Sequence, residues 1–409
     1  MTAANDTLVA DTTPRPIAGI RLAVAASGTR YKNRNDLTVL EIAPESTVEC
    51  LFTQNLFCAA PVTVARRHLA EGRARYVVVN AGNANAGTGA EGEARCLEVC
   101  AALAAAGGVA TADVLPFSTG VIGQQLNAQA LSAPMPALIA ALDADAWEPA
   151  AHAIMTTDTR PKLRSVAVEA DGARFAVTGI TKGSGMIKPN MATMLAYVAT
   201  DAAVAPAVFR EIARRACNLS FNRITVDGDT STNDALVLIA TAKSGAPRID
   251  SLSHPLCARL AAAVEAVCLG LAHDIVRDGE GATKFVAVEV RGGHSEADCA
   301  RVAYAVAESP LVKTALFASD ANWGRILAAV GRAGAERLAI DEVDIAIGGV
   351  PIIAGGEPAA GYTEAQGAAV MKQSDIHIAI SIGRGPHATT VWTCDFSYDY
   401  VKINADYRS

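Results

Sequence analysis

Short runs of β-branched residues alternate with Ala- and Leu-rich segments of helical period along most of this chain of 409 residues. The β-branched runs predict strands at residues 76–80, 165–169, 236–240, 285–290, 345–353 and 377–382. Segments with apolar residues at every third or fourth position predict helices at residues 62–71, 92–106, 206–216, 255–275 and 321–333. This mixture is typical of α/β proteins, in which sheets and helices pack as layers.

The polar, glycine-containing loops that could carry chemistry lie between Asn80 and Lys284, and the chain after Phe285 is plainer. The length allows two or three domains. We therefore predict a catalytic α/β domain at residues 1–285 and a smaller C-terminal α/β domain at residues 286–409. Only about the first fifteen residues, rich in Asp, Thr and Pro, are typical of a loose terminus.

Composition excludes several classes of protein. Apolar residues make up 51% of the chain and charged residues 19%, which is the opposite of the balance found in disordered proteins. The net charge is −7, and acidic and basic residues are interleaved without a basic block. A nucleic-acid-binding protein normally carries a cationic stripe, so this class of partner is not expected.

The cysteines and the absence of a targeting pattern predict a cytoplasmic protein. The nine cysteines are scattered and odd in number, and no second pair at metal-ligand spacing accompanies Cys96 and Cys100, so we expect reduced core residues. The N-terminus lacks the basic-then-apolar pattern of a secretory signal. The most apolar uncharged run, residues 99–112, is too short to span a bilayer.

Two motifs resemble binding loops only superficially. Residues 87–92 match G-x-G-x-x-G, but the preceding strand is predicted to end near Asn80, too early for a dinucleotide turn. Residues 227–234 resemble the opening of a calcium loop, but Thr232 replaces its glycine and Leu238 its bidentate glutamate. A hydrogen-bonded polar loop or a simple turn fits this segment better. No H-E-x-x-H or G-x-S-x-G motif is present, so no metal site and no histidine-assisted hydrolase is predicted.

A threonine at the end of a polar loop permits self-cleavage. Two glycines and a proline make residues 181–192 a loop, and Thr193 follows the small residue Ala192 at the entry to an apolar run. The Thr193 hydroxyl could attack the Ala192 carbonyl, and water would then release an N-terminal threonine. Its α-amine, with a pKa of about 7.7–8.0, can accept the proton of its own hydroxyl near neutral pH. Spacing alone does not exclude an ordinary loop threonine.

This segment resembles the cleavage region of the ornithine acetyltransferases, the bifunctional glutamate N-acetyltransferases of arginine biosynthesis. The resemblance covers nearly the whole chain. It includes further motifs, in the same order, at residues 57–61, 80–89, 118–123, 155–159, 227–234, 278–284, 319–325 and 399–409. It implies a self-processing acyltransferase fold of layered sheets sandwiched by helices.

The resemblance also implies roles for individual residues. Cleavage would fall between Ala192 and Thr193, and Thr193 would be the catalytic nucleophile. Thr119 and Gly120 would stabilise the oxyanion. Substrate binding is assigned to Thr156, Lys182, Thr193, Glu280, Asn404 and Ser409. The family often ends in threonine where this chain has serine, and both residues supply a hydroxyl.

The implied reaction is a ping-pong transfer of acetyl from N2-acetylornithine to glutamate, which gives ornithine and N-acetylglutamate. The implied chains are α (residues 1–192) and β (residues 193–409), associated as an α2β2 heterotetramer. No metal or prosthetic group is implied. Some members of the family also accept acetyl-CoA as donor and others do not, and no residue of this sequence distinguishes the two.

Two alternatives fit the same residues. A self-processing amidase or aminopeptidase would use the same nucleophile with water as acceptor, and would release acetate at the same rate with and without glutamate. An unprocessed metabolite-binding protein would run as a single band on a denaturing gel, rather than as two chains.

Overall fold

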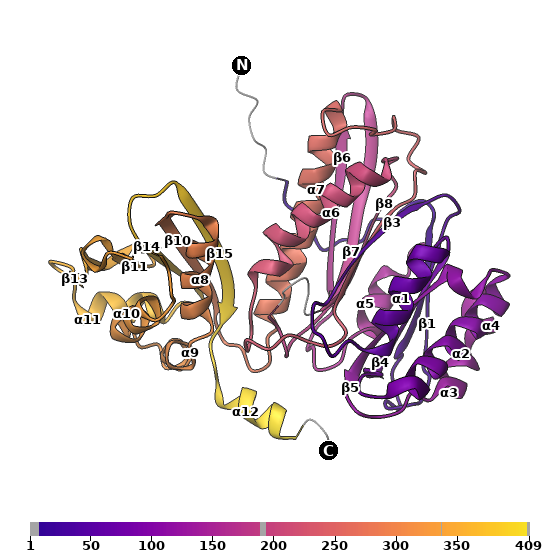
Figure 1. The fold of residues 1–409 in the computed structure, drawn as a ribbon, viewed down its shortest axis with the longest axis horizontal. Helices are drawn as coiled ribbons and strands as arrows, with labels where there is room; N and C mark the ends of the chain where they lie inside the picture. Colours follow the sequence, from indigo (N-terminus) through magenta and orange to yellow (C-terminus); the bar gives the residue numbers. More distant parts are fainter. Residues whose placement is uncertain (1–7, 189–193, 337, 407–409) are drawn as a thin grey trace. The chain divides into compact units, whose positions relative to one another are not determined.

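The computed structural model describes residues 8–188, 194–336 and 338–406. The chain forms two compact units (Figure 1). Unit 1 comprises Met1–Gly183, Pro189–Asn222 and Thr230–Ile275. Unit 2 comprises Ser184–Lys188, Arg223–Asp229 and Val276–Ser409, so two short segments from earlier in the chain belong to it.

Unit 1 contains a four-stranded sheet covered by helices. Its order is β1 (Ile20–Ala25), β2 (Leu37–Ile42), β4 (Tyr76–Asn83) and β5 (Val114–Val121), and only β4 and β5 are parallel. Side chains alternate along each strand, so Tyr76 and Val78 face a core shared with the helices, whereas Val77 and Val79 face the other way. Those helices are α2 (Gly89–Gly107), α3 (Ala128–Ser132) and α4 (Met135–Ala140), and the 3₁₀ turn η1 (Thr111–Asp113) follows α2.

The second sheet of unit 1 has five strands. Its order is β3 (Thr47–Phe52), β9 (Ala235–Ala240), β8 (Leu195–Thr200), β7 (Ala173–Lys182) and β6 (Lys162–Ala170). Two helices lie on one of its sides (Figure 1). Helix α6 (Pro206–Leu219) contacts β3 and β9, and α7 (Pro255–Arg277) lies so close to β7 that a Cβ on Gly179 would meet Val267 and Leu271.

One apolar core joins the two sheets of unit 1. The side chains of Val77 and Val79 meet residues of the second sheet there, and Phe117 of β5 packs edge-on against Tyr197 of β8 with ring centroids 5.5 Å apart. Helices α1 (Ala60–Glu71) and α5 (Trp147–Ala153) contribute to the same core. The predicted α/β class, with layered sheets flanked by helices, is confirmed.

Unit 2 is built on one six-stranded sheet. Its order is β13 (Glu357–Pro358), β12 (Val350–Ala354), β11 (Asp344–Ile347), β14 (Asp375–Ser381), β10 (Phe285–Gly293) and β15 (His387–Cys394). The apolar core of unit 2 includes residues of α8 (Glu296–Ala307), α9 (Pro310–Phe317), α10 (Trp323–Gly331) and α11 (Glu364–Met371). Unit 2 also contains α12 (Tyr398–Ala405) and the 3₁₀ turn η3 (Ile340–Glu342), and the 3₁₀ turn η2 (Phe221–Arg223) lies where the chain passes from unit 1 to unit 2.

The prediction of a single strand at residues 345–353 is wrong, because these residues form a β-hairpin. Strands β11 and β12 pair antiparallel, and Gly348 and Gly349 form the turn between them with φ of 54° and 81°. Two successive positive φ angles are what a tight two-residue hairpin turn requires, and glycine adopts them without strain.

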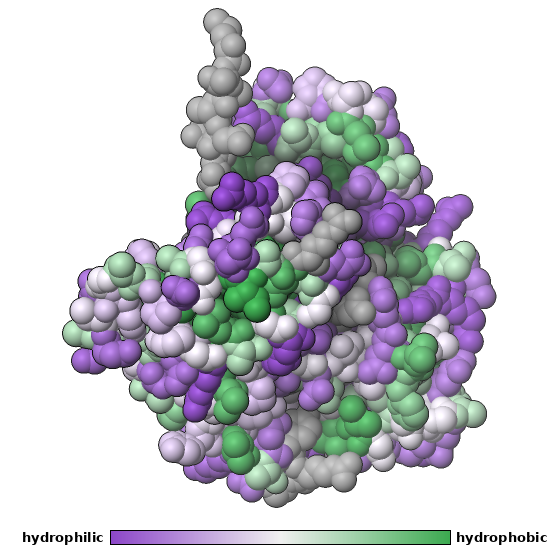
Figure 2. Space-filling model, turned by 60° about the vertical axis from the view of Figure 1, so that its left-hand side comes forward, coloured by the Kyte–Doolittle hydropathy of each residue, from purple (hydrophilic) through white to green (hydrophobic). Residues whose placement is uncertain are grey.

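Exposed large apolar side chains come from several separate elements. In the space-filling view, hydrophilic residues cover much of the visible face and hydrophobic ones lie in separate patches (Figure 2). The exposed set includes Val9, Leu56, Phe57, Met186, Leu252, Leu311, Ile340, Tyr398 and Val401.

Among the described residues, helix α7 has the length and the apolar composition that crossing a membrane requires. Half of its most apolar window is buried in the protein. Leu260, Val264, Val267 and Leu271 are all fully or almost fully buried. The helix predicted at residues 255–275 therefore packs one face against the core.

Candidate active site

The two residues predicted to stabilise an oxyanion lie at the end of β5. Thr119 is buried, and Gly120 pairs with Gly82 of the parallel neighbour β4. Gly120 has a φ of 133°, and a Cβ added to it would lie 2.2 Å from the carbonyl carbon of Gly82. Only glycine therefore allows the two backbones to approach this closely.

Side-chain amides hold this strand end in place. Ser118 donates to Asn80 Oδ1 at 2.6 Å, which links β5 to β4. Asn233 Nδ2 donates to the carbonyls of Ala84 at 2.6 Å and Ser118 at 2.9 Å, and all these groups are buried. Asn233 belongs to the polar loop predicted at residues 227–234, and these bonds show which backbone segments it fixes.

One buried carboxylate, Asp158, links the backbone at Thr156 to the backbone next to Lys182. Asp158 accepts hydrogen bonds from the Thr156 amide at 2.9 Å and from the Gly183 amide at 2.8 Å. The Lys162 ammonium also donates to Asp158, with Nζ 2.6 Å from Oδ1, and both side chains are fully buried. Burial raises the pKa of Asp158, but the charges of Lys162 and Lys182 outweigh it and hold the pKa well below its usual range.

In unit 2, Glu280 and Asn404 form a pair. Asn404 Nδ2, on α12, donates to Glu280 Oε2 at 2.7 Å. The Glu280 amide donates to the carbonyl of Ser184 at 2.9 Å. A Cβ on Gly185 would lie 2.4 Å from the Glu280 carboxylate, so the glycine leaves the space that this side chain occupies.

Asp227 fixes the start of the loop that leads to residues 189–193. Its carboxylate accepts hydrogen bonds from the amides of Met186 at 2.6 Å and Ile187 at 2.8 Å. Burial raises the pKa of Asp227, and these amide bonds act in the opposite direction. The residue lies in the polar loop predicted from the sequence, but nothing in the sequence indicates which backbone amides it binds.

The predicted site residues are divided between the units. Thr119, Gly120, Thr156 and Lys182 belong to unit 1, and Glu280 and Asn404 belong to unit 2. The remaining predicted residues lie outside the described residues: Ala192, Thr193 and Ser409. The roles assigned to all of them stay predictions.

Within residues 8–188, 194–336 and 338–406, no three His, Cys, Asp or Glu side chains come together as a possible metal site. All nine cysteines are described, and each is a free thiol. Seven of them are buried and two partly buried, as expected for reduced core residues.

The sequence profile of the ArgJ family matches residues 21–409. The chain belongs to the ArgJ family. A protein of Psychrobacter arcticus named arginine biosynthesis bifunctional protein ArgJ is 56% identical over 394 residues, which cover 96% of this chain and 97% of that protein. The protein of the same name from Pseudomonas fluorescens is 51% identical over 397 residues, 97% of this chain and 98% of the relative.

A solved structure of an ArgJ protein also resembles the chain. The crystal structure of arginine biosynthesis bifunctional protein ArgJ from Bacillus halodurans is 40% identical, covers 50% of this chain and 95% of that chain, and gives a TM-score of 0.48. Membership of the ArgJ family rests on the sequence matches. It confirms the predicted resemblance and the predicted class of enzyme, an acetyltransferase of arginine biosynthesis.

Replacing Gly185 by alanine should destabilise unit 2. The added methyl group would lie 2.4 Å from the Glu280 carboxylate, so that side chain or the Ser184–Gly185 backbone must move. Overpacking costs about 1–3 kcal/mol of the free energy of unfolding, and we expect the low end of this range because the end of the Glu280 side chain can shift at the expense of its bond from Asn404. Denaturant titration would measure it. Gly331→Ala is the matched control, because its Cβ would meet nothing within 4 Å. Equal stability of both variants and wild type would contradict the close approach.

Proposed function

We propose that this chain transfers the acetyl group of N2-acetylornithine to glutamate through Thr193, which self-cleavage at Ala192–Thr193 makes N-terminal. Membership of the ArgJ family over residues 21–409, with 56% identity to an arginine-biosynthesis protein, carries this proposal. The arrangement of the described residues supports it in three respects, which concern the oxyanion, the substrate carboxylate and the substrate amine.

The chemistry begins with the Thr193 hydroxyl. Its oxygen attacks the acetyl carbonyl of N2-acetylornithine, and the Thr193 α-amine takes the hydroxyl proton. The carbon–nitrogen bond breaks, ornithine leaves with a proton, and acetyl-Thr193 remains. The amine of glutamate then attacks this ester, which gives N-acetylglutamate and restores the threonine. No metal or prosthetic group is required by these steps.

The negative oxygen that develops in each step needs hydrogen-bond donors already in position. Thr119 offers a side-chain hydroxyl. Gly120, whose backbone lies against the neighbouring strand, offers a backbone amide. The bonds from Asn233 and Ser118 keep this strand end rigid. Rigid donors stabilise a transition state because they need no reorganisation during the reaction.

The charges of the two substrates explain the residue types. Both substrates carry an α-carboxylate, which the ammonium of Lys182 can bind together with Thr156. N2-acetylornithine also carries a side-chain ammonium, which suits Glu280. The hydrogen bond from Asn404 orients the Glu280 carboxylate within unit 2. The resemblance to the family assigns substrate binding to Ser409 as well.

The subunit assembly and the cellular location are proposed from membership of the ArgJ family. We propose α chains of residues 1–192 and β chains of residues 193–409 in an α2β2 heterotetramer in the cytoplasm, acting on small molecules. The relatives are named bifunctional, and acetyl-CoA is the second donor to test. Formation of N-acetylglutamate from acetyl-CoA and glutamate alone would establish it.

Two charge-removing variants test the substrate assignments. Glu280→Gln should raise the KM for N2-acetylornithine about tenfold or more, because a charge-assisted bond is lost, and should leave the KM for glutamate unchanged or lower. Lys182→Met should raise both KM values, since both substrates present a carboxylate. Steady-state rates with each substrate varied in turn measure this. Equal effects of Glu280→Gln on the two substrates would contradict the assignment of Glu280 to the amine.

A further inference from the structure

Asp158 lies between two predicted substrate-binding residues, although no substrate role has been assigned to it. It follows α5 and is separated from Thr156 by one residue. Its side chain is fully buried, as is that of Lys162. The oxygens of a buried carboxylate are normally hydrogen-bonded. The hydrogen-bond partners of Asp158 therefore show which parts of the chain it holds in place.

The first oxygen of Asp158 fixes the peptide bond that precedes Thr156. Oδ2 accepts a hydrogen bond from the Thr156 amide at 2.9 Å. On the other side of the same peptide, Arg34 donates to the carbonyl of Met155, and its guanidinium lies over the Tyr31 ring, 3.9 Å from the centroid. Both polar groups of this peptide are therefore held, so the orientation of Thr156 is set from two directions.

The second oxygen fixes the backbone that follows Lys182. Oδ1 accepts from the Gly183 amide at 2.8 Å, at the point where β7 ends. The same oxygen accepts from Lys162, the first residue of β6, which lies opposite Thr181 in the β6–β7 ladder. Lys162 thus anchors the carboxylate to the sheet that carries Lys182.

An ionised carboxylate is suited to this task because it only accepts hydrogen bonds and its two oxygens keep a fixed spacing. Groups bonded to the two oxygens must therefore keep a fixed spacing as well. Lys162 and Lys182 favour the ionised form of Asp158 despite its burial. The carboxylate stays an acceptor toward both backbone amides.

We propose that Asp158 is a positioning residue that sets the spacing between Thr156 and Lys182, with Lys162 as the buried counter-ion that holds it in place. The proposal rests on the proposed function, in which Thr156 and Lys182 bind substrate. It adds a specific claim: the Asp158 carboxylate acts on substrate affinity through two backbone amides, and not only on folding.

A buried ion pair can also have a purely structural role, and a double variant separates the two roles. Asp158→Asn leaves the Lys162 ammonium buried beside a neutral amide, and Lys162→Met leaves a carboxylate without this cation, so each single variant should lower the Tm. In Asp158→Asn with Lys162→Met this charge imbalance is gone, and the Tm should recover in part, because one buried backbone amide still lacks its acceptor.

The KM values should not recover in the double variant. Asparagine has one acceptor oxygen and a donor nitrogen, so it cannot accept from both the Thr156 and the Gly183 amide. We expect the KM for N2-acetylornithine and for glutamate to stay raised about tenfold, with kcat changed less than about threefold, since a buried amide has lost its partner. Rates are measured on the full-length enzyme and corrected for the cleaved fraction.

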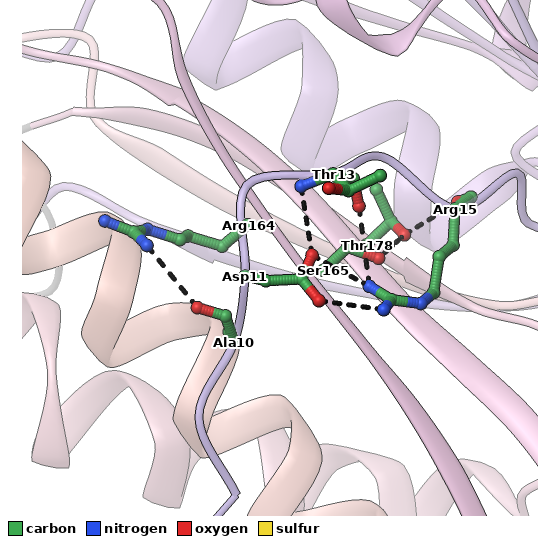
Figure 3. A network of polar contacts seen from close by, with 7 residues as sticks. All are labelled: Ala10, Asp11, Thr13, Arg15, Arg164, Ser165 and Thr178. Atoms are coloured by element: carbon green, nitrogen blue, oxygen red, sulfur yellow. Dashed lines mark hydrogen bonds and ion pairs between the residues drawn. The ribbon is translucent and has the colours of Figure 1, made fainter.

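The Arg164–Asp274 pair provides a matched control. Arg164 also lies on β6, and its guanidinium binds both oxygens of Asp274 at 2.6 and 2.7 Å. It donates to the Ala10 carbonyl as well, where the N-terminal segment runs along β6 (Figure 3). Arg164→Met with Asp274→Asn removes a cation–carboxylate pair from the same strand and should leave both KM values at their wild-type level.

Return of both KM and Tm to wild-type values in the Asp158/Lys162 double variant would overturn the proposal, because the pair would then be structural only. Raised KM values in the Arg164/Asp274 control would overturn it too, since any lost pair on β6 would have the same effect. Lys182→Met with unchanged KM values would instead overturn the proposed substrate site on which the inference rests.

Discussion

Thr193→Ala is expected to leave the chain uncleaved and without acetyl transfer. The variant lacks both the hydroxyl that attacks the Ala192 carbonyl and the nucleophile that carries the acetyl group. Removal of a catalytic nucleophile lowers turnover by roughly 10⁶-fold in a comparable acyl-transfer enzyme. A denaturing gel should show one band at the full mass of 42.2 kDa instead of two near half that mass.

Thr193→Ser is the control for this variant, because it retains a hydroxyl. We expect it to cleave and to turn over, both more slowly than wild type. A cleaved Thr193→Ala protein would refute the assignment of the nucleophile. An inactive, uncleaved Thr193→Ser protein with a wild-type Tm would argue against a hydroxyl-based mechanism.

Gly120→Ala should have the second-largest effect. A methyl group there would lie 2.2 Å from the Gly82 carbonyl carbon and 2.6 Å from the Asn83 amide nitrogen, so β5 must move away from β4. That movement displaces the predicted oxyanion donors, each of which is worth about 10²–10³-fold in kcat. Both the rate of self-cleavage and the kcat of the cleaved enzyme should fall by about this factor.

The Gly123→Ala variant distinguishes the steric clash expected in Gly120→Ala from the strain of a non-glycine residue at positive φ. Gly123 also has a positive φ, 82°, but a Cβ there would meet nothing within 4 Å. This variant should lose about 1–2 kcal/mol of stability through strain alone, and its kcat should stay close to that of wild type. Similar losses of kcat in both variants would show that the close contact with Gly82 is not what matters.

The strands that could be predicted from the sequence are those with a clear pattern. β9 is a continuous run of apolar residues and is buried throughout, whereas β14 alternates between buried and more exposed positions. β5 was harder to predict because Pro116 interrupts it, and proline argues against a central strand. The structure resolves this conflict, since β5 lies at the edge of its sheet, where proline is tolerated.

The site was only partly predictable, for a different reason. Motifs indicated Thr119, Thr156, Lys182 and Glu280 individually, but not the residues that hold them. Asp158, Asn233 and Asp227 bind backbone amides and carbonyls, several of them far away in the chain, for example the carbonyl of Ser118 bound by Asn233. A backbone group has no type-specific signature in a sequence, so partners of this kind become visible only in the structure.

The mass of the β chain after incubation with N2-acetylornithine shows whether Thr193 carries the acetyl group. We expect a separate chain of residues 193–409 that gains the mass of one acetyl group on Thr193. Addition of glutamate should remove this group and produce one N-acetylglutamate for each acetyl group lost. An unacetylated β chain, or acetate released at the same rate with and without glutamate, would contradict acetyl transfer through Thr193.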